Sequence, residues 1–179
     1  MMIQKKDIQI YKKETGKHLQ NVKTAFENFD LKEAIEKAAK SIDPTNDNKM
    51  FSHQRRVGYK IANSGYELLK QREDDLRNCQ SFEEILAITD KVSKQIFRLG
   101  PLWSYDTALR IGFQKEIYPK NVYLQAGVKN GYKKVFNQNP KNRFEEKNKF
   151  PKELQILEPY EIENFLCIWG NDKQKNKSC

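Results

Sequence analysis

The strongest constraint on the fold is an apolar pattern at helical spacing between residues 82 and 99, with a start signal and a stop signal at its ends. Ser81 and Glu84 form a capping box at the start. Gly100-Pro101 ends the pattern, because glycine tolerates a positive φ and proline cannot continue the hydrogen-bond ladder. The expected buried face consists of Phe82, Ile85, Leu86, Ile88, Thr89, Val92, Ile96 and Leu99. One amphipathic helix is therefore predicted here.

The rest of the chain repeats such helical signals and contains no β-rich run. Helices are predicted loosely over residues 3–28, and then over 31–42, 55–76, 105–117, 119–126 and 160–169. Asp30 and Glu33 cap the second of these helices, Ser52 the third and Ser104 the fourth, while Pro119 and Pro159 suit first turns. The sequence therefore predicts an all-α fold, a compact multi-helix domain with an N-terminal helical extension.

A polar, proline-containing segment, residues 43–49, is the best candidate for a boundary inside the chain. It predicts an N-terminal helical region over 1–43, a helical domain over 50–170 and a polar tail over 171–179. The 179 residues suit one domain with such an extension. Gly58 and Gly65 lie seven residues apart, which favours close approach of another backbone to the third helix over a merely weakened helix.

Composition excludes a membrane protein. Hydrophobic residues make up 37% and charged residues 32%, and no run of about 18 apolar residues exists. The first residues lack the apolar centre of a secretion signal. A cytoplasmic location and no membrane partner are expected.

The net charge of +9 is concentrated in one part of the sequence. Between Lys120 and Phe150 there are eight basic residues and two acidic ones, and Asn130-Gly131 offers a turn among the lysines. Such a surface attracts polyanions by neutralising phosphates and releasing counterions. The alternative is that lysine serves solubility, and the low share of arginine in this segment favours that alternative, since arginine makes the bidentate phosphate contacts.

Two resemblances to known sequences bear on the fold and the function. The corner around GPLWSYDTALRIG (100–112) resembles the helix-hairpin-helix motif, whose signature is LPGIGPKTA, with Thr107-Ala108 at its Thr-Ala and neither hairpin glycine in place. In that motif, backbone amides of the hairpin hold a phosphate. GPLWSYDTALRIG, PKNVYLQAG and LQILEPYEIENFLCIW are also similar to a group of uncharacterised bacterial proteins with GxLYVYDTALRIG, PxxVYLHAG and EIEDFLCIY, over roughly residues 52–170. This second resemblance implies a fold and no chemistry.

Candidate contact residues follow from the corner and the basic segment. The expected nucleic-acid-binding residues are Gly100, Ser104, Lys129, Lys133, Lys134 and Arg143. Arg55 and Arg56 suit either a phosphate contact or a solvated helix end, and the second is the commoner role of such residues. A possible pocket consists of Tyr105, Asp106, Arg110, Tyr123 and Gln125, although Asp106 and Arg110 equally suit an ion pair one helical turn apart. Aromatic residues such as Trp103 and Tyr132 suit either base stacking or the core.

No catalytic group, metal or cofactor is predicted. The two histidines and three cysteines are scattered, which favours neither a zinc site nor a Cys/His nucleophile. DNA glycosylases that use helix-hairpin-helix need a carboxylate just beyond the second helix, but the residues around Gln125 at that place include none. Many of these enzymes also need a lysine in the hairpin, and here Asp106 stands in its place. No phosphate-binding glycine loop occurs. Whether the chain is an enzyme stays open.

Two functions are therefore expected. The first is binding of nucleic acid without sequence specificity, through the 100–112 corner and the lysine-rich flank. DNA is the expected ligand in preference to RNA. The second is a protein-interaction module that uses the N-terminal helices. The first predicts binding that falls steeply with salt, and the second predicts copurification with a protein.

Overall fold

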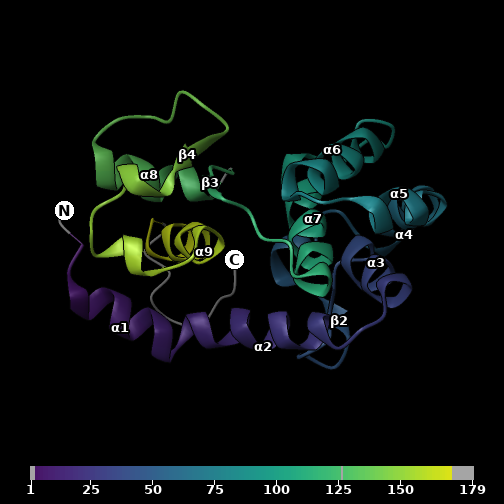
Figure 1. The fold of residues 1–179 in the computed structure, drawn as a ribbon, viewed down its shortest axis with the longest axis horizontal. Coiled ribbons are helices and arrows are strands. Elements are labelled where there is room, and N and C mark those ends of the chain that lie inside the picture. Colours follow the sequence, from purple (N-terminus) through teal and green to yellow (C-terminus); the bar gives the residue numbers. More distant parts are fainter. Residues whose placement is uncertain (1–2, 126, 171–179) are drawn as a thin grey trace. The chain divides into compact units, whose positions relative to one another are not determined.

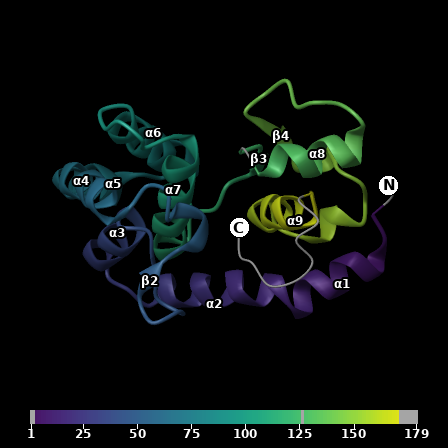
Figure 2. The same ribbon diagram turned by 180° about the vertical axis from the view of Figure 1, so that it is seen from behind.

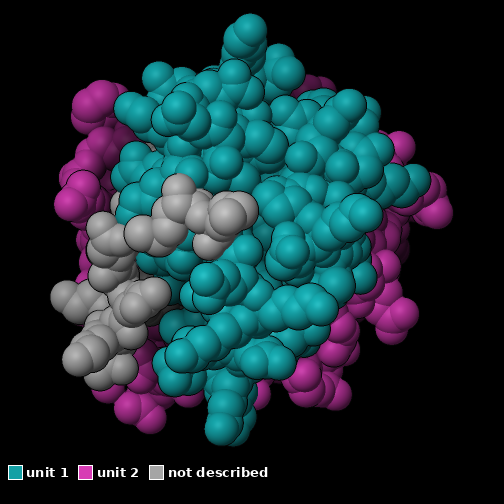
Figure 3. All heavy atoms as spheres, turned by 90° about the vertical axis from the view of Figure 1, so that its left-hand side faces the viewer, with its two compact units in different colours: residues 1–20, 119–179 teal, residues 21–118 magenta. Residues whose placement is uncertain are grey.

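The structure, a computed structural model, describes residues 3–125 and 127–170 and divides the chain into two compact units (Figure 3). Unit 1 consists of residues 1–20 and 119–179, and unit 2 consists of residues 21–118. The predicted polar tail, residues 171–179, lies outside the described residues, as does the PKNVYLQAG alanine at position 126.

Helices dominate both units, which confirms the predicted all-α fold (Figure 1). The α-helices of the described residues are α1 (Lys5–Lys13), α2 (Thr15–Glu27), α3 (Leu31–Ala39), α4 (Tyr59–Leu69), α5 (Glu73–Asn78), α6 (Phe82–Ser93), α7 (Pro101–Lys115), α8 (Val128–Phe136) and α9 (Pro159–Gly170). Short 3-10 helices are η1 (Ser52–Gln54), η2 (Lys70–Arg72), η3 (Lys147–Lys149) and η4 (Leu154–Ile156). Two antiparallel pairs of strands complete the fold: β1 (Ile42–Asp43) with β2 (Lys49–Met50), and β3 (Asn121–Tyr123) with β4 (Phe144–Glu146).

Unit 2 is built around α7, which packs against α3 and α6 (Figures 1 and 2). The predicted caps are present: the Asp30 carboxylate accepts from the Glu33 amide at 2.7 Å, and the Ser81 hydroxyl accepts from the Glu84 amide at 3.3 Å. Trp103 is 1% exposed, and its indole N–H donates to the Ala39 carbonyl at 2.9 Å. A buried indole with its donor satisfied fixes α7 against α3.

Unit 1 is built around α8 and α9, which lie side by side (Figures 1 and 2). A Cβ atom added to Gly131 would lie 2.3 Å from the Leu166 carbonyl oxygen, so glycine is what permits this close approach. The N-terminal helix α1 belongs to the same unit, because Ile8 and Tyr11 are buried in its core and the Tyr11 ring meets Phe165 edge-on at 5.5 Å.

The units divide the chain at places other than the predicted boundary. Residues 44–48 form turns between β1 and β2 inside unit 2, with the Thr45 amide bonded to Asp43 at 2.9 Å. The predicted N-terminal region 1–43 and helical domain 50–170 are therefore each shared between the units. The polar segment 43–49 suggests a boundary, but it carries no information on which distant part of the chain helix α1 packs against.

Four local predictions need correction. The helix from Phe82 ends at Ser93, because the chain then forms turns up to residue 99. The next helix begins at Pro101, which suits the first helical position, and not after Ser104. The segment predicted as a helix from Pro119 is strand β3, where Val122 pairs with Glu145. Asn130-Gly131, the predicted turn, lies within α8.

The two glycines of the predicted third helix behave differently. Gly65 lies in α4, and an added Cβ there would come 2.7 Å from the Trp103 ring. Close packing at Gly65 is therefore as predicted, but the group that approaches is a side chain and not another backbone. Gly58 has φ of 80° and precedes α4, with nothing within 4 Å of an added Cβ. Its role is the left-handed turn before the helix.

Candidate functional site

The most exposed large apolar side chain among the described residues lies in the turn between α6 and α7. Phe97 is 89% exposed, whereas Leu99, two residues later, is 7% exposed. The turn is held by backbone bonds, with the Leu99 amide donating to the Ile96 carbonyl at 3.1 Å. Because Leu99 is fixed inward, Phe97 faces solvent.

Arginine joins this turn to a second one. Arg98 has φ of 78°, and its guanidinium Nη2 donates to the Arg56 carbonyl at 2.5 Å. Arg55 and Arg56 follow η1 and are exposed, as are Lys94 and Arg98. We call Arg55, Arg56, Lys94, Phe97 and Arg98 the basic corner.

The segments that form the basic corner contain no acidic residue. Residues 50–66 and 91–105 carry six exposed basic side chains and no Asp or Glu: Arg55, Arg56, Lys60, Lys91, Lys94 and Arg98. The fixed bond between Arg98 and the Arg56 backbone brings the two segments together. Like charges on segments that lie together favour binding of an anion, although Asp90 and Asp106 flank the second segment.

The basic corner is positioned by buried polar contacts. Oδ2 of Asp106, on α7, lies 2.7 Å from Nε2 of His53 and accepts from Nε2 of Gln54 at 2.7 Å. Arg110, one helical turn further along α7, lies 3.5 Å from the same oxygen and packs its guanidinium 3.9 Å from the centre of the Phe51 ring. His53 and Gln54 lead directly into Arg55, so Asp106 anchors the turn that carries the arginines.

The charge states of Asp106 and Arg110 follow from this burial. Burial raises the pKa of Asp106, but the charges of His53 and Arg110 and the hydrogen bonds from His53 and Gln54 outweigh it, so the pKa lies below its usual value. Burial lowers the pKa of Arg110, against the opposing charges of Asp106 and Asp43. Asp106 is therefore a carboxylate at neutral pH, and it acts as the centre of an ion pair inside unit 2.

The structure tests the predicted contact residues of the corner one by one. Gly100 is the N-cap of α7 and is half-buried, with nothing within 4 Å of an added Cβ. Ser104 is fully buried, and its hydroxyl donates to the Asp90 carboxylate at 2.5 Å. The prediction for Ser104 is wrong, because a residue without exposed surface makes no contact with a polyanion. Its hydroxyl holds α7 to α6 instead.

The predicted lysine flank lies in unit 1 and is only partly free. Lys129 and Lys133 are exposed and lie one turn apart on α8. Lys134 is half-buried, with Nζ 5.9 Å from the centre of the Trp169 ring, and Arg143 lies 6.0 Å from the centre of the Tyr123 ring. Lys129 and Lys133 therefore form the outward basic face of α8.

The predicted pocket residues are distributed over both units. Asp106 and Arg110 form the ion pair described above, and Tyr105 is buried beside Phe82, with the ring centres 5.8 Å apart. Tyr123 and Gln125 belong to unit 1 and are buried at 3% and 5% exposure. Within unit 2, the ion-pair interpretation of Asp106 and Arg110 is confirmed.

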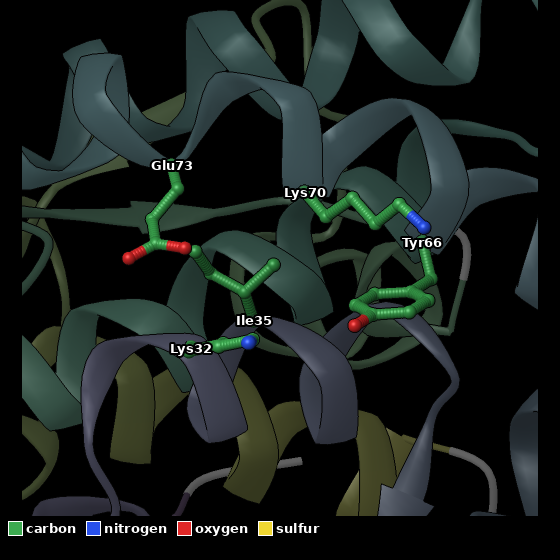
Figure 4. A pocket seen from close by; sticks show the side chains of 5 residues that line it. All are labelled: Lys32, Ile35, Tyr66, Lys70 and Glu73. Atoms are coloured by element: carbon green, nitrogen blue, oxygen red, sulfur yellow. The ribbon is translucent and has the colours of Figure 1, made fainter.

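A small hollow of about 140 Å³ lies between α3 and the segment from α4 to α5 (Figure 4). It is lined by Lys32, Ile35, Tyr66, Lys70 and Glu73. Lys70 pairs with Glu67 at 2.5 Å, and Lys40 Nζ lies 4.5 Å from the centre of the Tyr66 ring. Since Tyr66 and Lys70 are engaged with neighbouring side chains, this hollow serves below as a control surface.

Within residues 3–125 and 127–170, no three His, Cys, Asp or Glu side chains gather where they would hold a metal ion. The same residues include no helix with the length and hydropathy needed to cross a membrane. Comparisons of the chain with models of protein families, with curated proteins and with solved structures found no significant match in any of the three.

Sequence reasoning misses Phe97, Lys94 and Arg98 as site residues because it places them inside a longer helix. The signal that finds them is the absence of acidic residues over 50–66 and 91–105. Arg55 and Arg56, for which the sequence leaves a phosphate contact or a solvated helix end open, form part of the basic corner.

Proposed function

We propose that this chain binds nucleic acid without sequence specificity, and that the basic corner of unit 2 holds the phosphate backbone. The observation that carries the proposal is the pair of acid-free segments joined by the bond from Arg98 to the Arg56 carbonyl. Arginine suits phosphate because its planar guanidinium donates two parallel hydrogen bonds. The outward lysines of α8, Lys129 and Lys133, add a second basic surface in unit 1.

The absence of sequence specificity follows from where the arginines stand. The major groove, where all four base pairs can be distinguished, admits a helix or a two-stranded ribbon. Arg55, Arg56 and Arg98 stand on turns, and their neighbours in the chain are anchored in unit 2. Side chains on such turns reach phosphates, which position a protein on nucleic acid but carry no sequence information.

The alternative, a protein-interaction module that uses the N-terminal helices, has less support. Helix α1 turns Ile8 and Tyr11 into the core of unit 1, and Val22 and Phe26 of α2 are buried as well. These apolar side chains are therefore already covered within the chain, whereas Ile10 of α1 is 45% exposed. A partner that docks on apolar helix faces needs them exposed.

The test is fluorescence anisotropy with labelled single-stranded and double-stranded DNA and RNA across a salt series. With three or four phosphates neutralised, affinity falls roughly 20- to 50-fold for a single strand and roughly 40- to 150-fold for a DNA duplex between about 50 and about 200 mM salt. The variant Arg55→Glu/Lys94→Glu is expected to lose at least about tenfold in affinity at low salt. It removes two positive charges whose side chains are exposed.

The matched control is Lys32→Glu/Lys70→Glu, which makes the same change in charge at the hollow of Figure 4 on the same unit. It is expected to change the affinity less than about threefold, since distant exposed charges are screened by salt. No anisotropy change for any ligand at the lowest salt, or an equal loss in the control variant, contradicts the proposal.

A further inference from the structure

Phe97 is an exposed aromatic side chain on a turn that the fold holds in place. The amides of Gln95 and Ile96 donate to the carbonyls of Val92 and Ser93, at 3.0 and 3.3 Å, and the Leu99 amide completes the turn. Leu99 and the bond from Arg98 to the Arg56 carbonyl fix the chain beyond Phe97. The ring is 89% exposed and is presented by this bonded turn.

The side chains beside Phe97 in the chain specify what the ring would meet. Lys94 and Arg98 are exposed on either side of it, and the bond from Arg98 leads to Arg55 and Arg56. No acidic residue occurs in either segment. An exposed aromatic side chain with cationic residues close to it in the chain complements a nucleobase, because a nucleobase is a flat aromatic surface attached to a phosphate.

We infer that Phe97 stacks on an unpaired base and that the basic corner thereby selects single-stranded over double-stranded nucleic acid. The inference rests on the proposed function and deepens it. In a duplex both faces of each base are covered by neighbouring bases, so an outside ring gains no face to stack on. In a single strand a base is free to leave its neighbours and lie on Phe97 while Arg and Lys hold the flanking phosphates.

An anionic membrane surface also attracts an aromatic side chain beside cations. The turn, however, offers a single large apolar side chain, since Ile96 is half-buried and Leu99 is buried. Stable membrane attachment needs a larger apolar surface or a second anchor. The charge and the single ring therefore favour the nucleobase, and vesicles enter the test as a separate arm.

The experiment compares two single strands with the same phosphates. One is oligo(dT) of about 12 nucleotides, a length within the range of site sizes of proteins that bind single strands. The other has the same backbone with abasic sites. An oligo(rU) strand distinguishes RNA from DNA as the source of the base, and a duplex of equal length tests the selection. Anisotropy is measured for the wild-type chain, for Phe97→Ala and for Phe97→Trp.

Phe97→Ala is expected to weaken binding to oligo(dT) about tenfold, within the loss known for removal of one stacking aromatic. Its affinity for the abasic strand and for the duplex is expected to stay within about twofold, because the phosphate contacts remain. Phe97→Trp is expected to keep the oligo(dT) affinity of the wild-type chain, because the indole ring also stacks on a base. It adds an exposed indole whose fluorescence the bound bases quench. Ile156→Ala, at another exposed apolar residue, is the matched control and leaves all affinities unchanged.

The outcomes separate the two proposals. If wild-type protein binds both strands with steep salt dependence but Phe97→Ala weakens them equally or not at all, stacking is wrong and the proposed function stands. If wild-type protein binds none of the nucleic acids, both fail. Binding to phosphatidylserine vesicles that depends on Phe97, without binding to oligo(dT), overturns the inference in favour of a membrane surface.

Discussion

The two units differ in a way that net charge conceals. Unit 1 contains 17 Lys and Arg against 9 Asp and Glu, a net charge of +8, whereas unit 2 contains 16 against 15, a net charge of +1. Yet unit 2 also carries exposed basic residues on segments without Asp or Glu, those of the basic corner. The distribution of charge within a unit therefore matters for a candidate anion site as well as the total charge.

The acidic residues of unit 2 explain this distribution. Several stand in the first turns of α5 and α6, where a negative charge is favourable with the helix dipole: Glu73, Asp74, Asp75, Glu83 and Glu84. Two of them pair with Arg72 and Arg77. In unit 1, by contrast, Glu145 and Glu146 on β4 and Glu153 lie among the lysines of the same segment. Its positive charge is larger, and residues 117–144 contain no Asp or Glu.

The units are also held together differently, and the largest expected effect tests unit 1. In Gly131→Ala the new Cβ would lie 2.3 Å from the Leu166 carbonyl, so α8 and α9 must separate. We expect a loss of about 3 kcal/mol or more in the free energy of unfolding, measured by urea denaturation. Gly100→Ala, with open space around its Cβ, is the control and costs less than about 1 kcal/mol. Equal losses would show that α8 and α9 tolerate the added atom.

Unit 2 depends instead on the carboxylate of Asp106. In Asp106→Asn the buried Arg110 loses its counter-charge, and we expect a loss of about 2 to 4 kcal/mol in the free energy of unfolding. Asp47→Asn, whose side chain is 81% exposed beside Lys49, is expected to cost less than about 0.5 kcal/mol. A small effect at Asp106 would mean that the basic corner is anchored by other contacts.

The helices could largely be predicted from the sequence, because periodicity and caps are local. Asp30 and Ser81 cap as expected, and the start of α9 at Pro159 agrees with its signal. The packing partners could not be predicted. Gly131 follows Asn130, a pair typical of turns, but the close contact with α9 keeps it within a helix.

The candidate site could be predicted only in part, and for a comparable reason. The apolar positions at 96 and 99 continue the spacing of α6, so the sequence extends that helix through Phe97. In the structure Leu99 reaches the core from a turn, which turns Phe97 outward. The sequence favours Ser104 at a helix start because serine caps well, but Pro101 begins the helix one turn earlier and Ser104 becomes part of the core.

Charge reversal in unit 1 sharpens the comparison of the basic surfaces. Lys129→Glu/Lys133→Glu changes the charge as much as Arg55→Glu/Lys94→Glu does, but on the face of α8. We expect about a threefold loss of affinity for oligo(dT), compared with at least about tenfold for the variant in the basic corner. Anisotropy at one low salt concentration ranks the two. The reverse order would move the interface to unit 1.

The smallest expected effect is a dependence of stability on pH. The pKa of Asp106 is lower in the folded chain than its usual value, so its contribution is complete above the unfolded pKa of about 3.9 and is lost as pH falls through the folded pKa. Wild-type Tm is therefore expected to drop more steeply below about pH 4 than the Tm of Asp106→Asn. Parallel curves for the two proteins would contradict a charged Asp106 at the centre of the ion pair.

Ultraviolet cross-linking of the wild-type chain to oligo(dT), followed by tryptic digestion and mass spectrometry, tests the central claim most directly. Trypsin cleaves after Lys94 and Arg98, which isolates Phe97 in a short peptide. We predict that the principal nucleotide adduct lies on the peptide of residues 95–98 and disappears in Phe97→Ala. Adducts confined to peptides of unit 1, or none above those of the urea-denatured chain, would contradict the assignment of the interface to the basic corner.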